Sequence, residues 1–227
     1  MKGMTVVFDL DGTLVDTAPD LTGTLNHVLA GIGHGPVTTD DVRPVVAYGG
    51  RRMLKNILER AGDDASESRL DELLTVYLAH YREHLADASR PYEGVLQCLD
   101  WLTAQGVRLG VCTNKYEDLT FTLLDQLDLE RHFHAICGVD TFEVKKPHPD
   151  HLTRTIEMAG GRSDYAIMIG DTETDIATAK AAGIPVIAVT FGYSDVHVEK
   201  FQPDAMMDHY RELPDRIAEL VKGRAKA

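Results

Sequence analysis

The sequence predicts an α/β fold, a doubly wound parallel sheet with a Rossmann-like core and an inserted, all-helical cap domain. Three observations support this prediction. Short apolar runs bounded by Gly, Pro or polar residues recur along the chain, as buried parallel strands do. Helical periodicities lie between these runs, which is typical of a doubly wound sheet. One long stretch near the N-terminus has helical periodicity but contains no convincing strand.

The predicted core begins with the apolar strand 6–8. Further strands are predicted at 107–112, 135–137, 166–169 and 185–189. Apolar residues spaced by three and four predict helices between and after these strands. They form three stripes, namely Val95, Leu99 and Leu102; Leu119, Leu123 and Leu127; and Leu213, Ile217, Leu220 and Val221.

The stretch 16–90 is predicted to be a helical cap inserted after the first strand, with 1–15 and 91–227 forming the core domain. Thr17 is expected to cap the first cap helix, because an early proline and an acidic residue follow it. A stripe along a later cap helix comprises Leu70, Leu74, Tyr77, Tyr81 and Leu85.

Composition restricts the class of function. A chain of 227 residues can bury a large core, and its net charge of −13 disfavours nucleic acid and anionic membrane surfaces as partners. No segment approaches ~20 apolar residues, and no signal peptide is visible before Asp9. The three cysteines lack the spacing of a metal site and are expected to be reduced, buried thiols. We therefore expect a cytoplasmic protein.

An acidic pair follows the first predicted strand. Asp9 and Asp11 are separated by one residue, and the strand period of two predicts that both leave the same face. Gly12 then allows a sharp turn. Two carboxylates this close in a cleft stay ionised only if a cation or a shared proton compensates them. The pair therefore indicates metal-assisted chemistry at the carboxyl end of the sheet, where doubly wound folds bind ligands.

Two further segments place polar side chains beside predicted strand ends. Thr113 and Asn114 can hold an anionic oxygen, although taken alone they indicate a polar turn with a helix cap more strongly. Lys145 and Lys146 lie in a loop stiffened by prolines on both sides of His148, and such a loop can aim a lysine into a cleft. A solvated lysine pair is the alternative interpretation.

A second acidic cluster ends another predicted strand. Asp171 follows the run 166–170, and Asp175 faces the same side if a helical turn begins there. Such acids can also complement a helix dipole. Oxygen-only ligands with vacant positions suit Mg²⁺. One shared cleft with a Mg²⁺ ion is therefore predicted from Asp9, Asp11, Thr113, Lys146, Asp171 and Asp175.

In this order and spacing, the segments resemble the four motifs of the haloacid dehalogenase-like phosphohydrolases. The resemblance covers essentially the whole chain, and the helical insertion resembles the family's small-substrate cap. Within the family, the segments 145–150 and 189–193 most resemble those of bacterial phosphoglycolate phosphatases. The four motifs correspond here to 9–13, Thr113, Lys146 and 170–175.

The resemblance implies a Mg²⁺-dependent phosphatase for a small phosphate monoester, with 2-phosphoglycolate as the expected substrate. It implies that Asp9 attacks phosphorus to form an aspartyl-phosphate, and that Asp11 acts as general acid and then as general base. Mg²⁺ would be held by Asp9, the Asp11 backbone carbonyl and Asp171. Asp175 would orient water or Asp171. Lys146 would offset the charge of the nucleophile and the phosphoryl group.

Substrate contacts are expected from both regions. Thr113 and Asn114, with nearby backbone N–H groups, would bind the phosphoryl oxygens. In the cap, a glycine turn at Gly50 leads into a helix with two arginines. A guanidinium can grip a carboxylate through two parallel bonds, so Arg51, or failing that Arg52, is the expected contact for the substrate carboxylate. A solvated arginine at the helix start is the alternative.

Other functions remain open at this point. A sugar-phosphate mutase or a pyrophosphatase could use the same scaffold. A phospho-receiver or binding module also pairs acids with a lysine around Mg²⁺, but it needs only one small domain and no cap. The expected partner is a small phosphorylated metabolite, without nucleic acid or membrane, and the chain is expected to be a monomer or a homodimer.

Overall fold

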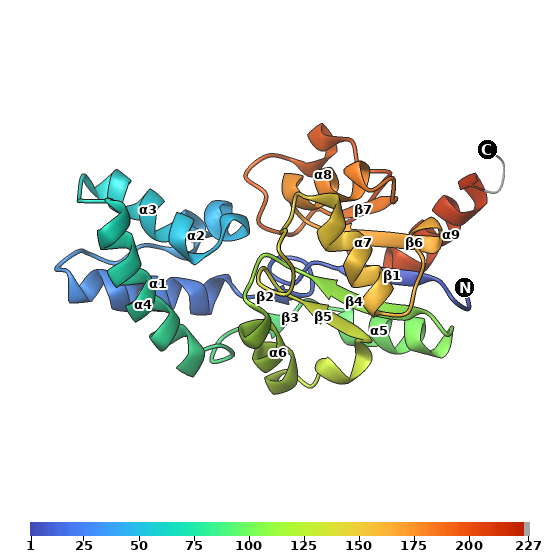
Figure 1. Cartoon of the computed structure of the whole chain (residues 1–227), viewed down its shortest axis with the longest axis horizontal. Helices are drawn as coiled ribbons and strands as arrows, with labels where there is room; N and C mark the ends of the chain where they lie inside the picture. The colour runs from blue at the N-terminus through green and yellow to red at the C-terminus, as the bar shows by residue number, and fades with distance from the viewer. Residues whose placement is uncertain (225–227) are drawn as a thin grey trace.

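The computed structural model describes residues 1–224, and it consists of a parallel α/β core beside a group of helices (Figure 1). The core strands are β1 (Thr5–Phe8), β4 (Arg108–Cys112), β5 (Ala135–Cys137), β6 (Ala166–Gly170), β7 (Val186–Val189) and β8 (Ala205–Met207). They form one six-stranded sheet in the order β5-β4-β1-β6-β7-β8, and every neighbouring pair is parallel. The prediction of a doubly wound parallel sheet is confirmed.

The predicted strands agree with the observed ones to within one residue at each end. The sequence did not predict β8 at the sheet edge. This strand has three residues, two of which are only half-buried. A run this short carries too little periodicity to indicate a strand.

The two faces of the sheet are covered by different helices (Figure 1). Val6 and Phe8 pack into one hydrophobic cluster and Val7 into another, as the strand period of two requires. The first cluster includes residues of α5 (Val95–Ala104), α6 (Glu117–Gln126) and α9 (Leu213–Arg224). The second includes residues of α7 (Pro149–Met158) and α8 (Glu173–Ala181).

The chain reverses its direction of travel across the sheet at β1. It runs from β1 to β4 and β5 on one side, and then returns to β6, β7 and β8 on the other. Ligands of open α/β sheets bind at such a switch point, beyond the carboxyl ends of the strands. The loops after β1, β4 and β6 therefore meet at the predicted position of the site.

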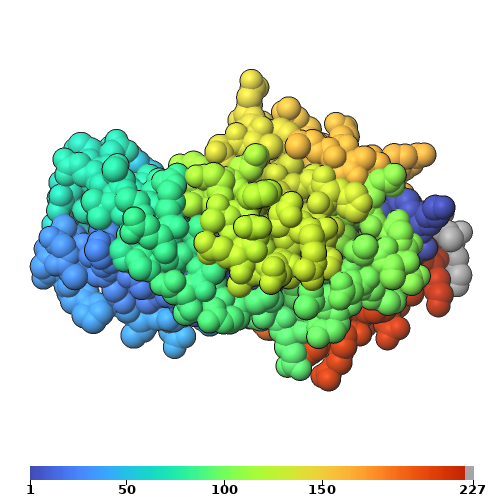
Figure 2. Space-filling model, turned by 90° about the horizontal axis from the view of Figure 1, so that it is seen from below, coloured from blue at the N-terminus to red at the C-terminus, as the bar shows by residue number. Residues whose placement is uncertain are grey.

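The stretch 16–90 forms the blue to teal lobe at the left of Figures 1 and 2. It contains α1 (Ala18–Gly31), α2 (Thr39–Val42), a 3₁₀ helix (Arg43–Tyr48), α3 (Gly50–Ala61) and α4 (Glu67–Glu83). Tyr77 and Tyr81 of the predicted α4 stripe are buried. The helical character of this stretch is as expected. The division into two domains stays a prediction, and residues 225–227 of the predicted core domain lie outside the described residues. The remaining 3₁₀ helices are Glu130–His132, Ser163–Tyr165, Val198–Phe201 and Tyr210–Glu212.

Two short strands occur where the sequence suggested none. β2 (Val15–Asp16) and β3 (Arg90–Pro91) pair antiparallel at the two ends of the helical region. Two residues are too few to show a period, so this pairing comes from the tertiary structure alone. It joins the entry and the exit of the helical region side by side.

The start of α1 also differs from expectation. Pro19 lies in the first turn as predicted, but the Thr17 side chain makes no capping hydrogen bond. Its Oγ1 instead donates to Asp11 Oδ1 at 2.6 Å. The Thr17 backbone is helical, with φ −96° and ψ −8°, rather than extended as a capping residue requires, so its oxygen does not accept from the first turn of α1.

The three cysteines are buried and free, as predicted. Within residues 1–224, no helix has both the length and the apolar character needed to cross a lipid bilayer.

Candidate active site

The candidate site lies at the carboxyl edge of the sheet. Asp9 directly follows β1, Thr113 follows β4 and Asp171 follows β6. Because β1 pairs in parallel with both β4 and β6, these three strand ends lie side by side. Residues more than 50 positions apart in the sequence are thus brought to one edge, as the strand pattern predicted.

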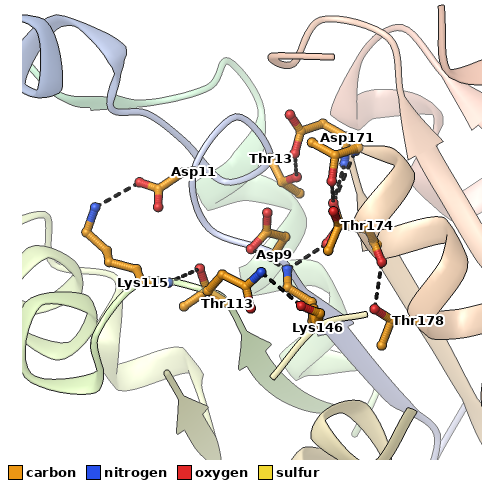
Figure 3. Close-up of polar contacts among 12 residues, drawn as sticks. Asp9, Asp11, Thr13, Thr113, Lys115, Lys146, Asp171, Thr174 and Thr178 are labelled. Carbon is orange, nitrogen blue, oxygen red and sulfur yellow. Dashed lines mark hydrogen bonds and ion pairs between the residues drawn. The ribbon is translucent and has the colours of Figure 1, made fainter. Parts of the chain in front are cut away.

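Lys146 is buried between two carboxylates (Figure 3). Its Nζ lies 2.8 Å from Asp9 Oδ1 and donates to Asp175 Oδ1 at 2.6 Å. Burial opposes the charge of the lysine, but Asp175 and Asp9 outweigh burial, so the pKa of Lys146 is raised above its ordinary value. Lys146 is therefore a permanent cation next to Asp9, and the alternative of a solvated lysine is wrong.

The backbone of Lys146 is fixed from two sides. Its N–H donates to His151 Nδ1 at 3.1 Å, and its carbonyl accepts from Asn114 Nδ2 at 3.2 Å. Burial, with Lys146 nearby, lowers the pKa of His151 to about 4, so the imidazole is neutral and serves as an acceptor. Asn114 thus supports the lysine loop, while its Oδ1 is buried without a hydrogen-bond partner among residues 1–224.

Asp171 and Asp175 have different surroundings. Asp171 accepts from Thr13 Oγ1 at 2.8 Å and from the Tyr193 N–H at 2.7 Å. Asp175 forms a capping box with Thr172 at the start of α8, accepting from its Oγ1 at 2.6 Å. Asp175 therefore caps the start of α8 and holds Lys146. Each carboxylate oxygen of Asp171 instead accepts one hydrogen bond, and these two bonds orient the side chain.

The donor set fits a divalent cation. Asp9, Asp171 and Asp175 are buried, and one carboxylate oxygen from each lies within 4.8 Å of the others. Burial raises the pKa of Asp9 to about 7, with Lys146 opposing the shift and Asp175 adding to it. Burial, followed by Asp175 and Asp9, also raises the pKa of Asp171. Hard oxygen ligands that lack sufficient positive charge are the environment that Mg²⁺ prefers.

Two glycines make room for the Asp171 carboxylate. A Cβ at Gly12 would overlap Asp171 Oδ2, and a Cβ at Gly192 would overlap the Asp171 side chain at Cβ, Cγ and Oδ2. Gly12 also has φ +84°, which favours glycine. The carboxylate is therefore enclosed by backbone on both sides and cannot move freely.

We expect Gly192→Ala to weaken Mg²⁺ binding by ~10–100-fold, because the added methyl displaces Asp171. The Mg²⁺-dependent rise in unfolding temperature measures this effect. Gly23→Ala is the matched control, since no atom lies within 4 Å of a Cβ at this position inside α1. An unchanged Mg²⁺ response of Gly192→Ala would contradict the assignment of Asp171 as a ligand.

Asp11 does not continue the alternation of β1. β1 ends at Phe8, so the strand period of two does not extend to Asp9 and Asp11. The prediction that both side chains leave the same face of the strand is therefore wrong. The Asp11 side chain points to Lys115, whereas Asp9 lies nearer Lys146 (Figure 3). Both carboxylates still line the same cavity. Asp11 is half-buried and is held through Oδ1 by Thr17 and Lys115, which leaves it separate from the three-carboxylate cluster.

The cavity above these residues has a volume of about 470 Å³ and is lined by both the core and the helical region. Thr113 lies on its wall, and its Oγ1 accepts from the Lys115 N–H at 3.2 Å. Thr113 therefore makes the polar turn that was its alternative interpretation and also faces the site. Gly50 and Arg51, at the start of α3, line the same cavity from the helical region.

Arg51 is partly engaged within the helical region. Its guanidinium donates to Glu67 Oε2 at 2.6 Å and also contacts Asp71. All three side chains are more than one-third exposed. Exposed ion pairs are worth about 0–1 kcal/mol, so a substrate carboxylate in the cavity can compete for this guanidinium.

The sequence did not assign functions to several residues that complete the site. Thr13 and Tyr193 orient Asp171, and Lys115 contacts Asp11. Lys115 follows Thr113 and Asn114 directly after the end of a predicted strand, so its position could have predicted that it lies at the site. The Tyr193 contact with Asp171 uses a backbone N–H, which every residue except proline has, so the sequence could not predict this contact.

Comparison with known families gives a match over most of the chain. The family model of haloacid dehalogenase-like hydrolases matches residues 6–189. A phosphoglycolate phosphatase of Mesorhizobium japonicum is 47% identical over 214 residues, covering 94% of each chain. A phosphoglycolate phosphatase of Agrobacterium fabrum is 44% identical over 223 residues, covering 97% of this chain and 96% of its own.

Comparison with solved structures agrees with this match. The crystal structure of a predicted phosphoglycolate phosphatase from Haemophilus somnus superposes with a TM-score of 0.88 at 26% identity. The superposition covers 95% of this chain and 98% of that one. The similarity therefore includes the helical region as well as the sheet.

Proposed function

Because the chain belongs to the haloacid dehalogenase-like hydrolases, we propose that it hydrolyses 2-phosphoglycolate through an aspartyl-phosphate intermediate and requires Mg²⁺. The chain is a phosphatase of this family. The observation that carries the proposal is the position of Asp9 beside Lys146 and Asp171 at the switch point of the sheet. The names of the two similar bacterial enzymes support the choice of substrate.

The proposed reaction has two steps. An Asp9 oxygen bonds to phosphorus while the bond from phosphorus to the substrate oxygen breaks, and the Asp11 carboxyl gives its proton to that oxygen. Water then bonds to phosphorus while the bond from phosphorus to Asp9 breaks, and Asp11 takes a proton from the water. The products are glycolate and inorganic phosphate, and Asp9 and Asp11 return to their initial states.

Charge compensation supplies most of the expected acceleration. Hydrolysis of a phosphate monoester requires up to ~10²¹-fold acceleration, whereas one general acid contributes ~10²–10⁴-fold. Lys146 stays protonated beside Asp9 and offsets the charge of the phosphoryl group. Mg²⁺, held by Asp9, Asp171 and the Asp11 backbone carbonyl, would neutralise further negative charge. Asp175 serves by holding Lys146 and the loop before α8.

The helical region 16–90 acts as a cap that selects the substrate in this proposal. Gly50 and Arg51 reach the cavity from the cap, while Thr113 and Asn114 reach it from the core. Core side chains that bind phosphate and a cap arginine in the same cavity suit a small molecule with two anionic groups. The cytoplasmic location and the monomeric or homodimeric state remain predictions.

We expect Arg51→Ala to lower kcat/KM for 2-phosphoglycolate by ~10–100-fold, because a charged hydrogen bond to the substrate carboxylate is lost. The ratio of kcat/KM for 2-phosphoglycolate to that for p-nitrophenyl phosphate, which has no carboxylate, is the measurement. Arg69→Ala is the control, since Arg69 also pairs with a cap carboxylate, Glu72 at 3.1 Å, but does not line the cavity. An unchanged ratio would remove Arg51 from the substrate site.

A Mg²⁺-dependent screen of phosphate esters tests the proposed function directly. It compares 2-phosphoglycolate with sugar phosphates, nucleotides and pyrophosphate by release of inorganic phosphate. Preference for pyrophosphate would favour the pyrophosphatase alternative, and a requirement for a bisphosphate activator would favour the mutase. A long-lived phosphoprotein without turnover would favour a phospho-receiver.

A further inference from the structure

Lys115 joins Asp11 to the helical cap. Its Nζ donates to Asp11 Oδ1 at 2.9 Å and to the Tyr81 hydroxyl oxygen at 2.6 Å. The ammonium also lies 4.6 Å from the centroid of the Tyr81 ring. The Lys115 side chain is 6% exposed, and Tyr81 is 2% exposed. One buried cation therefore connects three segments: the loop after β1, the loop after β4, and α4.

These contacts restrict the Asp11 carboxyl. Oδ1 accepts from both Lys115 Nζ and Thr17 Oγ1, whereas Oδ2 has no hydrogen bond among residues 1–224. Two donors on Oδ1 fix the orientation of the carboxyl and leave Oδ2 without a donor from the described residues. Lys115 thus decides which oxygen of Asp11 stays free and how that oxygen is presented.

Tyr81 in turn restricts Lys115. A lysine side chain has several rotatable bonds, and a single contact with Asp11 leaves its ammonium free to swing. The Tyr81 hydroxyl accepts a second hydrogen bond from the ammonium, at 2.6 Å. Tyr81 lies on α4 in the cap, whereas Lys115 and Asp11 belong to the core.

We propose that Tyr81 and Lys115 are positioning residues for the general acid, so that the cap contributes to proton transfer through Lys115. This inference rests on the proposed role of Asp11. The proton passes from Asp11 to the leaving oxygen while the bond from phosphorus to that oxygen breaks. Tyr81 and Lys115 exchange no proton in this step and act only on the placement of the Asp11 carboxyl.

The test uses leaving groups that differ in their need for a proton. Tyr81→Phe removes only the hydroxyl, and we expect it to lower kcat/KM for 2-phosphoglycolate ~10-fold, because the leaving alkoxide must be protonated. The loss with p-nitrophenyl phosphate should be much smaller, because p-nitrophenolate leaves without protonation. Lys115→Met should show the same selectivity with a loss of ~100-fold, and Tyr81→Phe should add little to it.

Tyr92→Phe is the control. The Tyr92 hydroxyl is also buried, but Tyr92 does not line the cavity that contains Asp11 and Lys115. We expect this variant to keep both activities. Circular dichroism and thermal unfolding show whether each variant is folded.

Two results would overturn the positioning role: an equal loss with both substrates in Tyr81→Phe, which indicates a merely structural role, or no loss with either. Asp11→Asn separates this failure from that of the proposed function. If Asp11→Asn is selective for 2-phosphoglycolate and Tyr81→Phe is not, only the positioning role is wrong. If Asp11→Asn lowers kcat/KM, which reports the first step alone, equally for both substrates, the general-acid role of Asp11 is itself wrong, and the positioning role fails with it.

Discussion

Asp9→Asn should abolish phosphate release, with kcat lower by ~10⁵-fold or more, while the protein stays folded. An amide oxygen is a far weaker nucleophile than a carboxylate, so no aspartyl-phosphate forms. The fold should tolerate the change because Lys146 keeps Asp175 as its partner. Burial already raises the pKa of Asp9 to about 7, so the charge removed is one that the interior disfavours. Release of inorganic phosphate from 2-phosphoglycolate measures the loss.

The control for this variant is Asp118→Asn, which removes an exposed carboxylate that pairs with Arg82 at 3.0 Å. It should keep normal activity. Thermal unfolding should give similar midpoints for both variants and the wild type. Normal turnover by Asp9→Asn would mean that the nucleophile lies elsewhere, and the assignment of the whole site would be wrong.

Excess chelator should reduce turnover to background, and added Mg²⁺ should restore it. One oxygen from each of three buried carboxylates lies within 4.8 Å of the others, and among residues 1–224 Lys146 is the one cation in direct contact with them. The cluster therefore needs further positive charge to accept a phosphoryl group. Asp171→Asn should raise the Mg²⁺ concentration for half-maximal activity by at least ~100-fold. It should also weaken the Mg²⁺-induced rise in unfolding temperature, a measurement that does not depend on activity.

A chelator already saturated with Mg²⁺ serves as the control for nonspecific inhibition and should leave turnover intact. If the enzyme keeps full activity in excess free chelator, the metal requirement is refuted. If chelation removes activity while Asp171→Asn retains the normal Mg²⁺ dependence, the ion is held by other groups.

Much of the core site could be predicted because its signals are local. Asp9 and Asp171 each end a buried apolar run, and parallel strands bring their carboxyl ends to one edge of the sheet. Lys146 lies in a proline-rich loop, and Asp175 lies one turn into a helix, as expected. These assignments need only the strand pattern and the order of the motifs.

The errors arose where the tertiary structure overrides the local sequence. Thr17 has the sequence of a helix cap, yet its backbone is helical and its hydroxyl donates to Asp11. The short strands β2 and β3 exist because the two ends of the helical region meet. Neither arrangement leaves a period or a motif in the sequence.

The sequence by itself determined the doubly wound sheet, the helical insertion and the residues that supply carboxylates and a lysine to one cleft. Side-chain period and strand-end position express these features within a few neighbouring residues. Only the tertiary structure decided the partners of each group, such as Tyr193 on Asp171 and Tyr81 on Lys115. Such contacts join segments 22 to 34 residues apart and depend on distances of a few tenths of an ångström, which packing sets and local sequence does not.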